Sequence, residues 1–361
     1  MVKKFFEFIE SGIELHYYCF DWDDNLLHMP SKIHMDNLID GKWVPTDVST
    51  SEFAKVRNDK ENWRLVNNLP DHAFCEFKDS GPRGADAFLI DTKASLSEKS
   101  FGPVWSNFIE CLTEGAIFAI ITARGHEPSS IRKSVEYIID HVLTDQEKFL
   151  LYSNCLKHVY IFKSDAEFDR IPKGKLSQTP LIKKYLDVCD FYGVTSDSFA
   201  KEFGKSSAVS PEQAKEQALD KFINKCNRLG KRIGAKSVSV GFSDDDQKNV
   251  EHVRKFFKEK SALSNELPHK LKLNLYKTTD RKLKGGERTK FHESTSPSQA
   301  PGMASSVMPF TQFNSMTSRL FPSETADQQD PTLNMSKLSS KYLAKLSKDI
   351  ERPKKRKRLK K

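Results

Sequence analysis

The feature that most constrains the fold is an apolar segment that ends at a pair of carboxylates. Residues 13–20 (IELHYYCF) are rich in apolar and aromatic side chains, and Asp21 and Asp23 follow them directly. A run of this kind is typical of a strand that is buried on both faces of a parallel sheet. We therefore predict a strand that delivers Asp21 and Asp23 at its carboxyl end.

Two other apolar runs are also followed directly by polar residues. Residues 116–121 (AIFAII) predict a strand that ends at Thr122, and residues 237–242 (SVSVGF) predict a strand followed by Asp244 and Asp245. Further strands are predicted at 188–194 and, as an edge strand, at 271–276, and helices at 104–112, 129–142, 211–229 and 250–257. Strands that alternate with helices form a doubly wound, mostly parallel α/β sheet, in which ligands bind beyond the carboxyl ends of the strands. The three distant segments are therefore expected to meet at one site.

The spacing of these elements predicts the domain organisation. Residues 1–280 form one catalytic domain, with insertions at about 28–100 and 143–187 that exceed what a crossover needs and are expected to form a cap or lid beside the site. Residues 285–330 are rich in Ser, Thr, Pro, Gln and Met, which predicts a disordered linker. Residues 331–361 are predicted to form a basic amphipathic helix and a polybasic tail.

The positive charge is concentrated at the end of the chain. The formal net charge is +9, and residues 331–361 contain 12 Lys or Arg and 2 Asp or Glu, whereas residues 1–269 carry −4. A basic segment of this kind favours polyanions through their phosphates and without sequence choice. We therefore expect non-specific contact with nucleic acid through residues 331–361, with a solvated tail as the alternative.

Other features predict a cytoplasmic protein without a membrane partner. No apolar stretch reaches about 18 residues, so no transmembrane helix is expected. The amino-terminal segment is interrupted by Glu7 and Glu10, too early for a signal peptide. The six cysteines lack the spacing of a zinc or redox motif and are expected to be buried thiols in a reducing compartment.

The pair of carboxylates after the first strand has a chemical interpretation. One of Asp21 and Asp23 can attack phosphorus while the other protonates the leaving oxygen. A hard cation held by such oxygens would let two anions approach each other. The alternative interpretation is a cluster that caps a turn.

Taken together, the segments resemble the four motifs of the haloacid dehalogenase-like (HAD) superfamily. The first motif lies at Asp21 and Asp23, and the second at Thr122 within IITARGHEP. The third is a lysine near the start of a helix, for which Lys215 is best placed, with Lys221 and Lys175 as alternatives. The fourth lies in GFSDDD at Asp244 and Asp245, with Asp246 adjacent, and which of these three acids meets a metal is left open.

The resemblance implies a role for each of these residues. Asp21 would be the nucleophile that becomes an aspartyl-phosphate, and Asp23 the general acid and then the base. Thr122 and Lys215 would hold the transferring phosphoryl group. Mg²⁺ would be bound by oxygens of Asp21, Asp23 (through its backbone carbonyl), Asp244 and Asp245. These roles suit phosphoryl transfer, in which positioning and electrostatics supply most of the catalysis.

Some positions depart from the family pattern or extend it. Asp24 and Asn25 stand where many members have Gly followed by Thr or Val. Asn25 is expected to bind the phosphate or to cap the turn, and Asp24 adds a charge near the site. Arg124 and His126 are expected to contact substrate at the mouth of the site, and the alternative for Arg124 is an ion pair with an acid in a solvated loop.

The leading hypothesis is a Mg²⁺-dependent phosphatase that acts on a phosphorylated substrate through an aspartyl-phosphate. Two alternatives remain open. One is a nucleic-acid end phosphatase that its basic tail tethers to the substrate. The other is a catalytically weak HAD-fold protein, of phage or viral type, that serves in binding or assembly.

Overall fold

The computed structural model describes residues 14–162, 174–203, 210–263, 270–278 and 289–294. All of them belong to one compact unit, residues 1–299. The linker beyond residue 294 and the predicted basic helix and tail at 331–361 lie outside the described residues. The predictions of disorder and of nucleic-acid contact for those segments therefore stay predictions.

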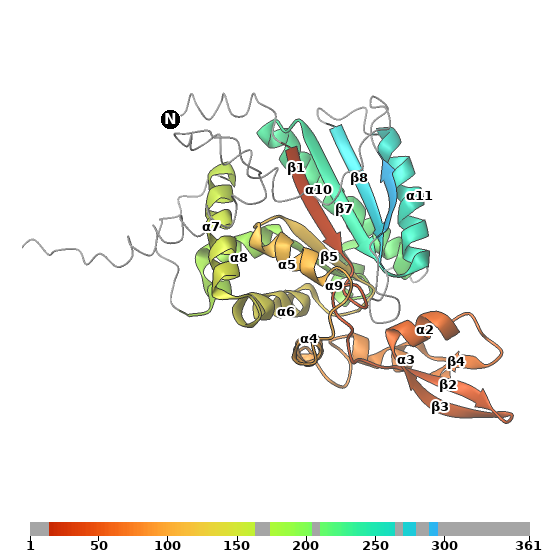
Figure 1. Cartoon of the computed structure of the whole chain (residues 1–361). Coiled ribbons are helices and arrows are strands. Elements are labelled where there is room, and N and C mark those ends of the chain that lie inside the picture. The colour runs from red at the N-terminus through yellow and green to blue at the C-terminus, as the bar shows by residue number, and fades with distance from the viewer. Residues whose placement is uncertain (1–13, 163–173, 204–209, 264–269, 279–288, 295–361) are drawn as a thin grey trace, which may run out of the picture. The chain divides into compact units, whose positions relative to one another are not determined.

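A six-stranded sheet forms the centre of this unit (Figure 1). Its strands, in spatial order, are β6 (Asp190–Gly193), β5 (Phe118–Thr122), β1 (Glu14–Phe20), β7 (Ser237–Asp244), β8 (Lys270–Lys277) and β9 (Thr289–Ser294). The first five strands are parallel, and β9 pairs with β8 in the antiparallel direction. The predicted α/β class, with a mostly parallel sheet, is thus confirmed.

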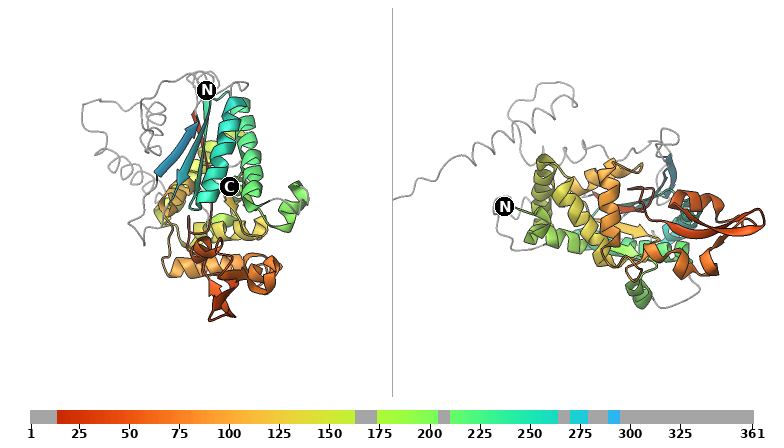
Figure 2. Two further views of the ribbon diagram at one scale, coloured as in Figure 1. Left: turned by 90° about the vertical axis from the view of Figure 1, so that its right-hand side faces the viewer. Right: turned by 90° about the horizontal axis from the view of Figure 1, so that it is seen from below.

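Helices cover both faces of the sheet (Figures 1 and 2). One face packs against α5 (Trp105–Thr113), α6 (Pro128–His141), α7 (Asp145–Phe162) and α8 (Pro180–Val188), and the other against α9 (Asp197–Phe203), α10 (Pro211–Ile233) and α11 (Gln247–Leu263). Each face of the sheet has its own apolar core, and β5 contributes side chains to both, because alternate side chains of a strand point to opposite faces. Phe118 and Ile120 lie in the first core and Ala119 and Ile121 in the second, all fully buried. All six cysteines are free thiols and five are buried.

The edge of the sheet differs from the prediction. We expected residues 271–276 to form an edge strand and the linker to begin at residue 285, but β8 is covered by β9 at residues 289–294. Strand β9 has the sequence TKFHES, which lacks an apolar alternation. An edge strand can form from such a sequence because its backbone pairs on one side only. The folded unit therefore extends past residue 280.

This boundary can be tested with two truncations. A chain that ends at residue 299 should keep the melting temperature of the full chain. A chain that ends at residue 284 loses β9 and exposes the backbone of β8, and its melting temperature should fall by on the order of 5 °C. Thermal unfolding followed by circular dichroism measures both. Equal melting temperatures for the two truncations would show that β9 adds nothing to the fold.

The first insertion forms a small substructure of its own. Its antiparallel sheet has the order β3 (Lys42–Val48), β2 (Ile33–Ile39) and β4 (Trp63–Leu65). Three helices and two short 3₁₀ turns complete it: α2 (Thr50–Val56), α3 (Pro70–Ala73), α4 (Ala87–Ser97), Val66–Asn68 and Cys75–Phe77. A separate apolar cluster holds it together, formed by Ile33, Met35, Val48, Ala73 and Phe77. Helix α4 is different, because its Phe88 belongs to the core of the main sheet.

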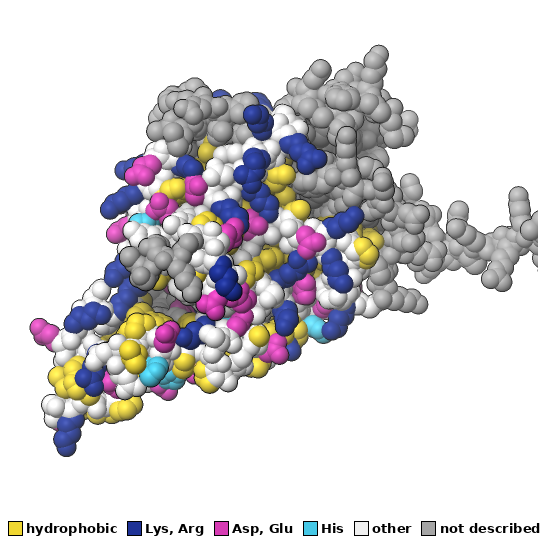
Figure 3. Space-filling model, turned by 180° about the vertical axis from the view of Figure 1, so that it is seen from behind, with side chains coloured by type: hydrophobic (Ala, Val, Ile, Leu, Met, Phe, Trp, Pro, Cys, Tyr) yellow, Lys and Arg dark blue, Asp and Glu magenta, His cyan; other side chains and the backbone are white. Residues whose placement is uncertain are grey.

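The surface of the insertion is more apolar than that of the sheet domain on the face seen in Figure 3. Hydrophobic side chains gather there over the insertion, and Ile39, Val44 and Leu69 are each more than a third exposed. Over the sheet domain, Lys and Arg alternate with Asp and Glu. On this face, therefore, the described surface is largely apolar over the insertion and carries mixed charge over the sheet domain.

The second insertion was wrongly predicted to be a cap. The described residues of the 143–187 segment form α7, a 3₁₀ turn at Leu176–Gln178 and α8. Leu151, Leu181 and Ile182 are buried in the same core as Phe118 of β5. The segment is long because it adds a helix to the layer before the crossover into β6. Its described residues, 143–162 and 174–187, pack against the face of the sheet and not beside the carboxyl ends of the strands.

Candidate active site

Three neighbouring strands place polar residues at one edge of the sheet. In the register of the sheet, Phe20 of β1 lies beside Ile120 of β5 and beside Ser243 of β7. Asp21 follows Phe20, and its backbone N–H donates to the carbonyl oxygen of Ser243 over 3.0 Å. Asp21 therefore lies between Thr122 and Asp244, and the predicted convergence of the three segments is confirmed.

Three carboxylates gather at this edge. Asp21, Asp244 and Asp245 each offer an oxygen that lies within 4.8 Å of the other two. Asp21 is 5% exposed and Asp244 is fully buried. Carboxylate oxygens at such separations are the ligands that a hard divalent cation such as Mg²⁺ prefers. The residues present thus fit the metal that the sequence motifs imply.

Lys215 lies among these carboxylates. It is 1% exposed, and its Nζ is 2.9 Å from Oδ1 of Asp21 and 2.8 Å from Oδ2 of Asp244. A capping box at Ser210 and Pro211 at the first helical position begin α10, which places Lys215 in its second turn. Of the two alternatives, Lys221 pairs with Glu202 and Lys175 is exposed. Lys215 is therefore the only one of the three candidates at the site.

The electrostatics of the cluster favour binding of a cation. Burial raises the pKa of Asp21 well above its usual value, and Asp244 raises it further, whereas Lys215 lowers it. Burial also raises the pKa of Asp245, with Asp244 and Asp21 adding to the effect. Burial by itself would lower the pKa of Lys215, but Asp21 and Asp244 outweigh it and raise that pKa. One ammonium therefore faces three carboxylates, and a further positive charge would relieve their repulsion.

The three acids at the end of β7 and in the loop after it, Asp244, Asp245 and Asp246, have different partners. Asp244 accepts hydrogen bonds from the backbone N–H of Asp246 and from the side-chain amide of Asn249. The carboxylate of Asp246 is held by both terminal nitrogens of Arg57, over 2.8 and 2.9 Å. Asp246 thus faces the insertion, and Asp244 and Asp245 are the acids that join Asp21 in the cluster. Which of them binds a metal stays a prediction.

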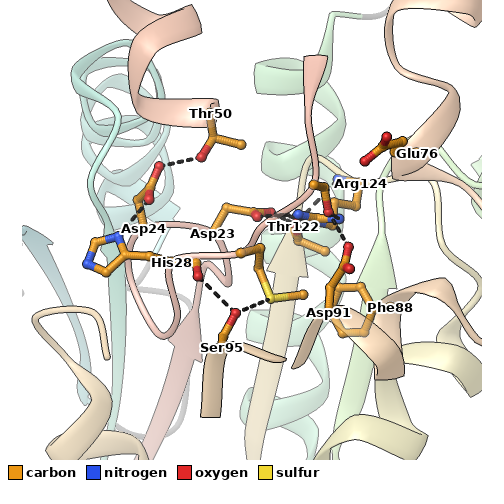
Figure 4. A network of polar contacts seen from close by, with 12 residues as sticks. Asp23, Asp24, His28, Thr50, Glu76, Phe88, Asp91, Ser95, Thr122 and Arg124 are labelled. Atoms are coloured by element: carbon orange, nitrogen blue, oxygen red, sulfur yellow. Dashed lines mark hydrogen bonds and ion pairs between the residues drawn. The ribbon is translucent and has the colours of Figure 1, made fainter. Parts of the chain in front are cut away.

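The carboxylate of Asp23 points to a different partner. Arg124 donates from Nε and Nη2 to its two oxygens, over 2.8 and 2.7 Å (Figure 4). Oγ1 of Thr122, which is fully buried, lies 3.4 Å from the same carboxylate. Two parallel charge-assisted hydrogen bonds fix the plane of a carboxylate as well as its position. The carboxylate of Asp23 is therefore paired outside the acidic cluster, and the predicted use of its backbone carbonyl by a metal stays a prediction.

Arg124 was predicted to contact substrate at the mouth of the site, and the structure corrects this. The residue is 1% exposed, and its guanidinium lies over the ring of Phe77 at 4.3 Å from the ring centroid. Its partner is Asp23, so the alternative of an ion pair with an acid is correct, although Arg124 itself is buried and not solvated. The neighbouring His126 is also fully buried, with Nδ1 2.7 Å from Asp79, and it is not at the mouth of the site.

Asn25 was predicted to bind substrate, and its contacts argue against this. The side chain is fully buried, and its amide nitrogen donates to the carbonyl oxygens of Asp21 and Ser243. Its amide oxygen accepts a hydrogen bond from Thr278 over 2.8 Å. Both ends of the amide are thus used within the protein. Asn25 ties the loop after β1 to β7 and to the residue after β8, which is the turn-stabilising role left as the alternative.

Helix α2 of the insertion contacts both acidic loops. Thr50, in its first turn, donates to Asp24 over 2.6 Å, and Nδ1 of His28 lies 2.7 Å from the same carboxylate. Arg57, at the other end of α2, holds Asp246. The charge of Asp24, which sequence analysis placed near the site without a partner, is therefore paired. The first insertion is thus attached next to the loops that follow β1 and β7, where the sequence predicted a cap.

Comparison with models of protein families, with curated proteins and with solved structures found no match. Within the described ranges, no helix is both long and apolar enough to cross a membrane.

Proposed function

We propose that this protein is a Mg²⁺-dependent phosphatase of the HAD type, which hydrolyses phosphate monoesters through an aspartyl-phosphate. The observation that carries the proposal is the separation of the site into two parts. A cluster of Asp21, Asp244, Asp245 and Lys215 lies beside a carboxylate, Asp23, that has its own arginine. A turn-capping cluster, the alternative interpretation, would not bury a lysine between two carboxylates.

Asp21 acts as the nucleophile. One of its oxygens forms a bond to phosphorus, and the bond from phosphorus to the leaving oxygen breaks on the opposite side. Asp21, Asp244 and Asp245 would hold Mg²⁺, which would supply positive charge that offsets the charge of the phosphate. Lys215 stabilises the same charge from the protein side, and burial of the site strengthens this interaction because little water competes.

Asp23 moves the protons. In the first step its carboxyl group gives a proton to the leaving oxygen, and in the second it takes a proton from the water that attacks the aspartyl-phosphate. Arg124 holds this carboxyl group in place during both steps, and the hydroxyl group of Thr122 lies on the same side. The two carboxylates therefore have separate roles because their surroundings differ.

The proposal is tested by following the release of inorganic phosphate from p-nitrophenyl phosphate. We expect turnover with Mg²⁺, and its loss when a chelator removes the metal. A pure, folded protein that releases no phosphate with Mg²⁺, from this ester or from a panel of phosphorylated metabolites and nucleic-acid ends, would favour the binding or assembly role instead.

A further inference from the structure

Apart from Asp23, the side chains that contact the guanidinium of Arg124 come from the first insertion. Its Nη1 donates to Oγ of Ser31 over 2.8 Å, and Ser31 in turn donates to the carboxylate of Asp91 on α4. Its guanidinium lies 4.3 Å from the ring centroid of Phe77 and 5.7 Å from that of Phe88. The insertion thus builds the pocket in which the arginine lies.

The hydrogen bonds in this pocket have a defined direction. A carboxylate only accepts hydrogen bonds and a guanidinium only donates them. Ser31 must therefore give its single hydroxyl hydrogen to Asp91, and its oxygen is left to accept from Arg124. The chain of hydrogen bonds runs from Arg124 through Ser31 to Asp91: Arg124 only donates, Asp91 only accepts, and Ser31 accepts one hydrogen bond and donates one.

The far end of the chain is fixed as well. Asp91 is 2% exposed, and Arg83 donates to both of its oxygens, over 2.9 Å to Oδ2. Ser31 is 1% exposed, so water has little access to replace its hydroxyl group. A buried carboxylate held by an arginine and a serine is a rigid support, because removal of any partner leaves a buried charge or donor unsatisfied.

Arg124 therefore has three of its donor atoms committed. Nε and Nη2 hold Asp23, and Nη1 holds Ser31. A guanidinium is planar, so contacts on Nε, Nη1 and Nη2 together fix its rotation. If Nη1 is released, the plane can tilt, and the carboxylate of Asp23 tilts with it.

We propose that Ser31, supported by Asp91, is a positioning residue for Asp23 that acts through Arg124, so that the first insertion is a working part of the acid/base machinery and not only a cover. The inference rests on the proposed function, because it assumes that Asp23 protonates the leaving oxygen. It adds a role for residues that lie outside all four sequence motifs.

A poorly oriented general acid affects some substrates more than others. A weakly basic leaving group, such as p-nitrophenolate, departs with little help from a proton, whereas phenolate needs more. The value of kcat/KM reports the step in which the leaving group departs, because it includes everything up to the first irreversible step. Loss of the Ser31 hydroxyl group should therefore steepen the dependence of kcat/KM on leaving-group basicity.

The experiment compares Ser31→Ala with the intact protein on p-nitrophenyl phosphate and phenyl phosphate, two esters of similar shape. We expect kcat/KM to fall by roughly tenfold or more for phenyl phosphate and by about twofold or less for p-nitrophenyl phosphate. Ser95→Ala is the matched control, because Ser95 is equally buried on the same helix as Asp91 but donates to the carbonyl oxygen of His28. The control should leave the ratio of the two values unchanged.

A second variant separates hydrogen bonding from packing. Ser31→Cys keeps nearly the same volume but replaces the hydroxyl group with a weak donor and acceptor. It should change the ratio in the same direction as Ser31→Ala, and it carries the test if Ser31→Ala fails to fold. Equal losses on both esters, or an unchanged ratio in a folded variant of an active enzyme, would overturn the role of Ser31 and leave the proposed function standing. An intact protein that is inactive on both esters with Mg²⁺ would overturn the proposed function itself.

Discussion

Asp21→Asn should abolish the hydrolysis of phosphate esters while leaving the fold intact. The amide cannot form the bond to phosphorus that the carboxylate forms, so kcat should fall by at least ~10³-fold. The volume of the side chain is kept. The change also removes one negative charge from a buried cluster in which burial and Asp244 already raise the pKa of Asp21.

Phosphate release and thermal unfolding together check this prediction. The variant should melt at the temperature of the intact protein or slightly above it, since one of several carboxylates that repel one another is replaced by a neutral group while Lys215 keeps its ion pair with Asp244. Ordinary turnover in a folded Asp21→Asn protein would mean that another residue is the nucleophile.

Removal of the metal should stop turnover, as Asp21→Asn does, and removal of a carboxylate of the cluster should weaken the binding of the metal. The cluster has three carboxylates and one ammonium, so its affinity for a divalent cation depends on each carboxylate. Asp244→Asn and Asp245→Asn should each weaken Mg²⁺ binding by on the order of tenfold or more, and chelation of the metal should stop turnover. Calorimetric titration of the metal-free protein with Mg²⁺ measures the affinity.

Asp246→Asn provides the matched control in the same loop. Its side chain pairs with Arg57, and the contact that it makes with Asp244 comes from its backbone N–H, which the substitution keeps. Most of the Mg²⁺ affinity should therefore remain. If Asp246→Asn weakened binding as much as the other two, or if neither Asp244→Asn nor Asp245→Asn weakened it, the acids of the cluster would be wrongly assigned.

The same cluster makes the stability of the metal-free protein depend on pH. The pKa of Asp245 is higher in the folded protein than in the unfolded chain, where it is about 4. At a pH between these two pKa values, Asp245 is protonated in the folded protein and ionised in the unfolded chain. The contribution of Asp245 to stability therefore falls as the pH rises through this window. The melting temperature of the intact protein minus that of Asp245→Asn should fall over the same window.

Much of the fold and of the acidic cluster was predictable because both depend on local pattern. Apolar runs located β1, β5 and β7, and parallel strands necessarily bring their carboxyl ends to one edge. Lys215 was singled out because Pro211 and the helical pattern after it mark where its helix begins. Pattern and topology together therefore sufficed to place the lysine among the acids.

The surroundings of the site could not be predicted in the same way. The roles of Arg124 and Asn25 depend on partners that packing supplies, and Ser31 and Asp91 lie in an insertion that has no regular period. A buried serine between an arginine and a carboxylate looks, in the sequence, like any other serine. Strand β9 was not predicted for a related reason: an edge strand forms by pairing with its neighbour, here β8, and does not require an apolar pattern.

Formation of an acyl phosphate on Asp21 is tested most directly by chemical trapping. The protein is mixed with Mg²⁺ and substrate, stopped during turnover and treated with borohydride, which reduces an acyl phosphate to an alcohol and so converts the aspartate into homoserine. Mass spectrometry of the peptide that contains Asp21 and Asp23 then locates the change. We predict homoserine at Asp21 only, and only when substrate and Mg²⁺ were both present. Modification of Asp23 instead, or steady turnover with Asp21 never modified, would contradict the assigned mechanism.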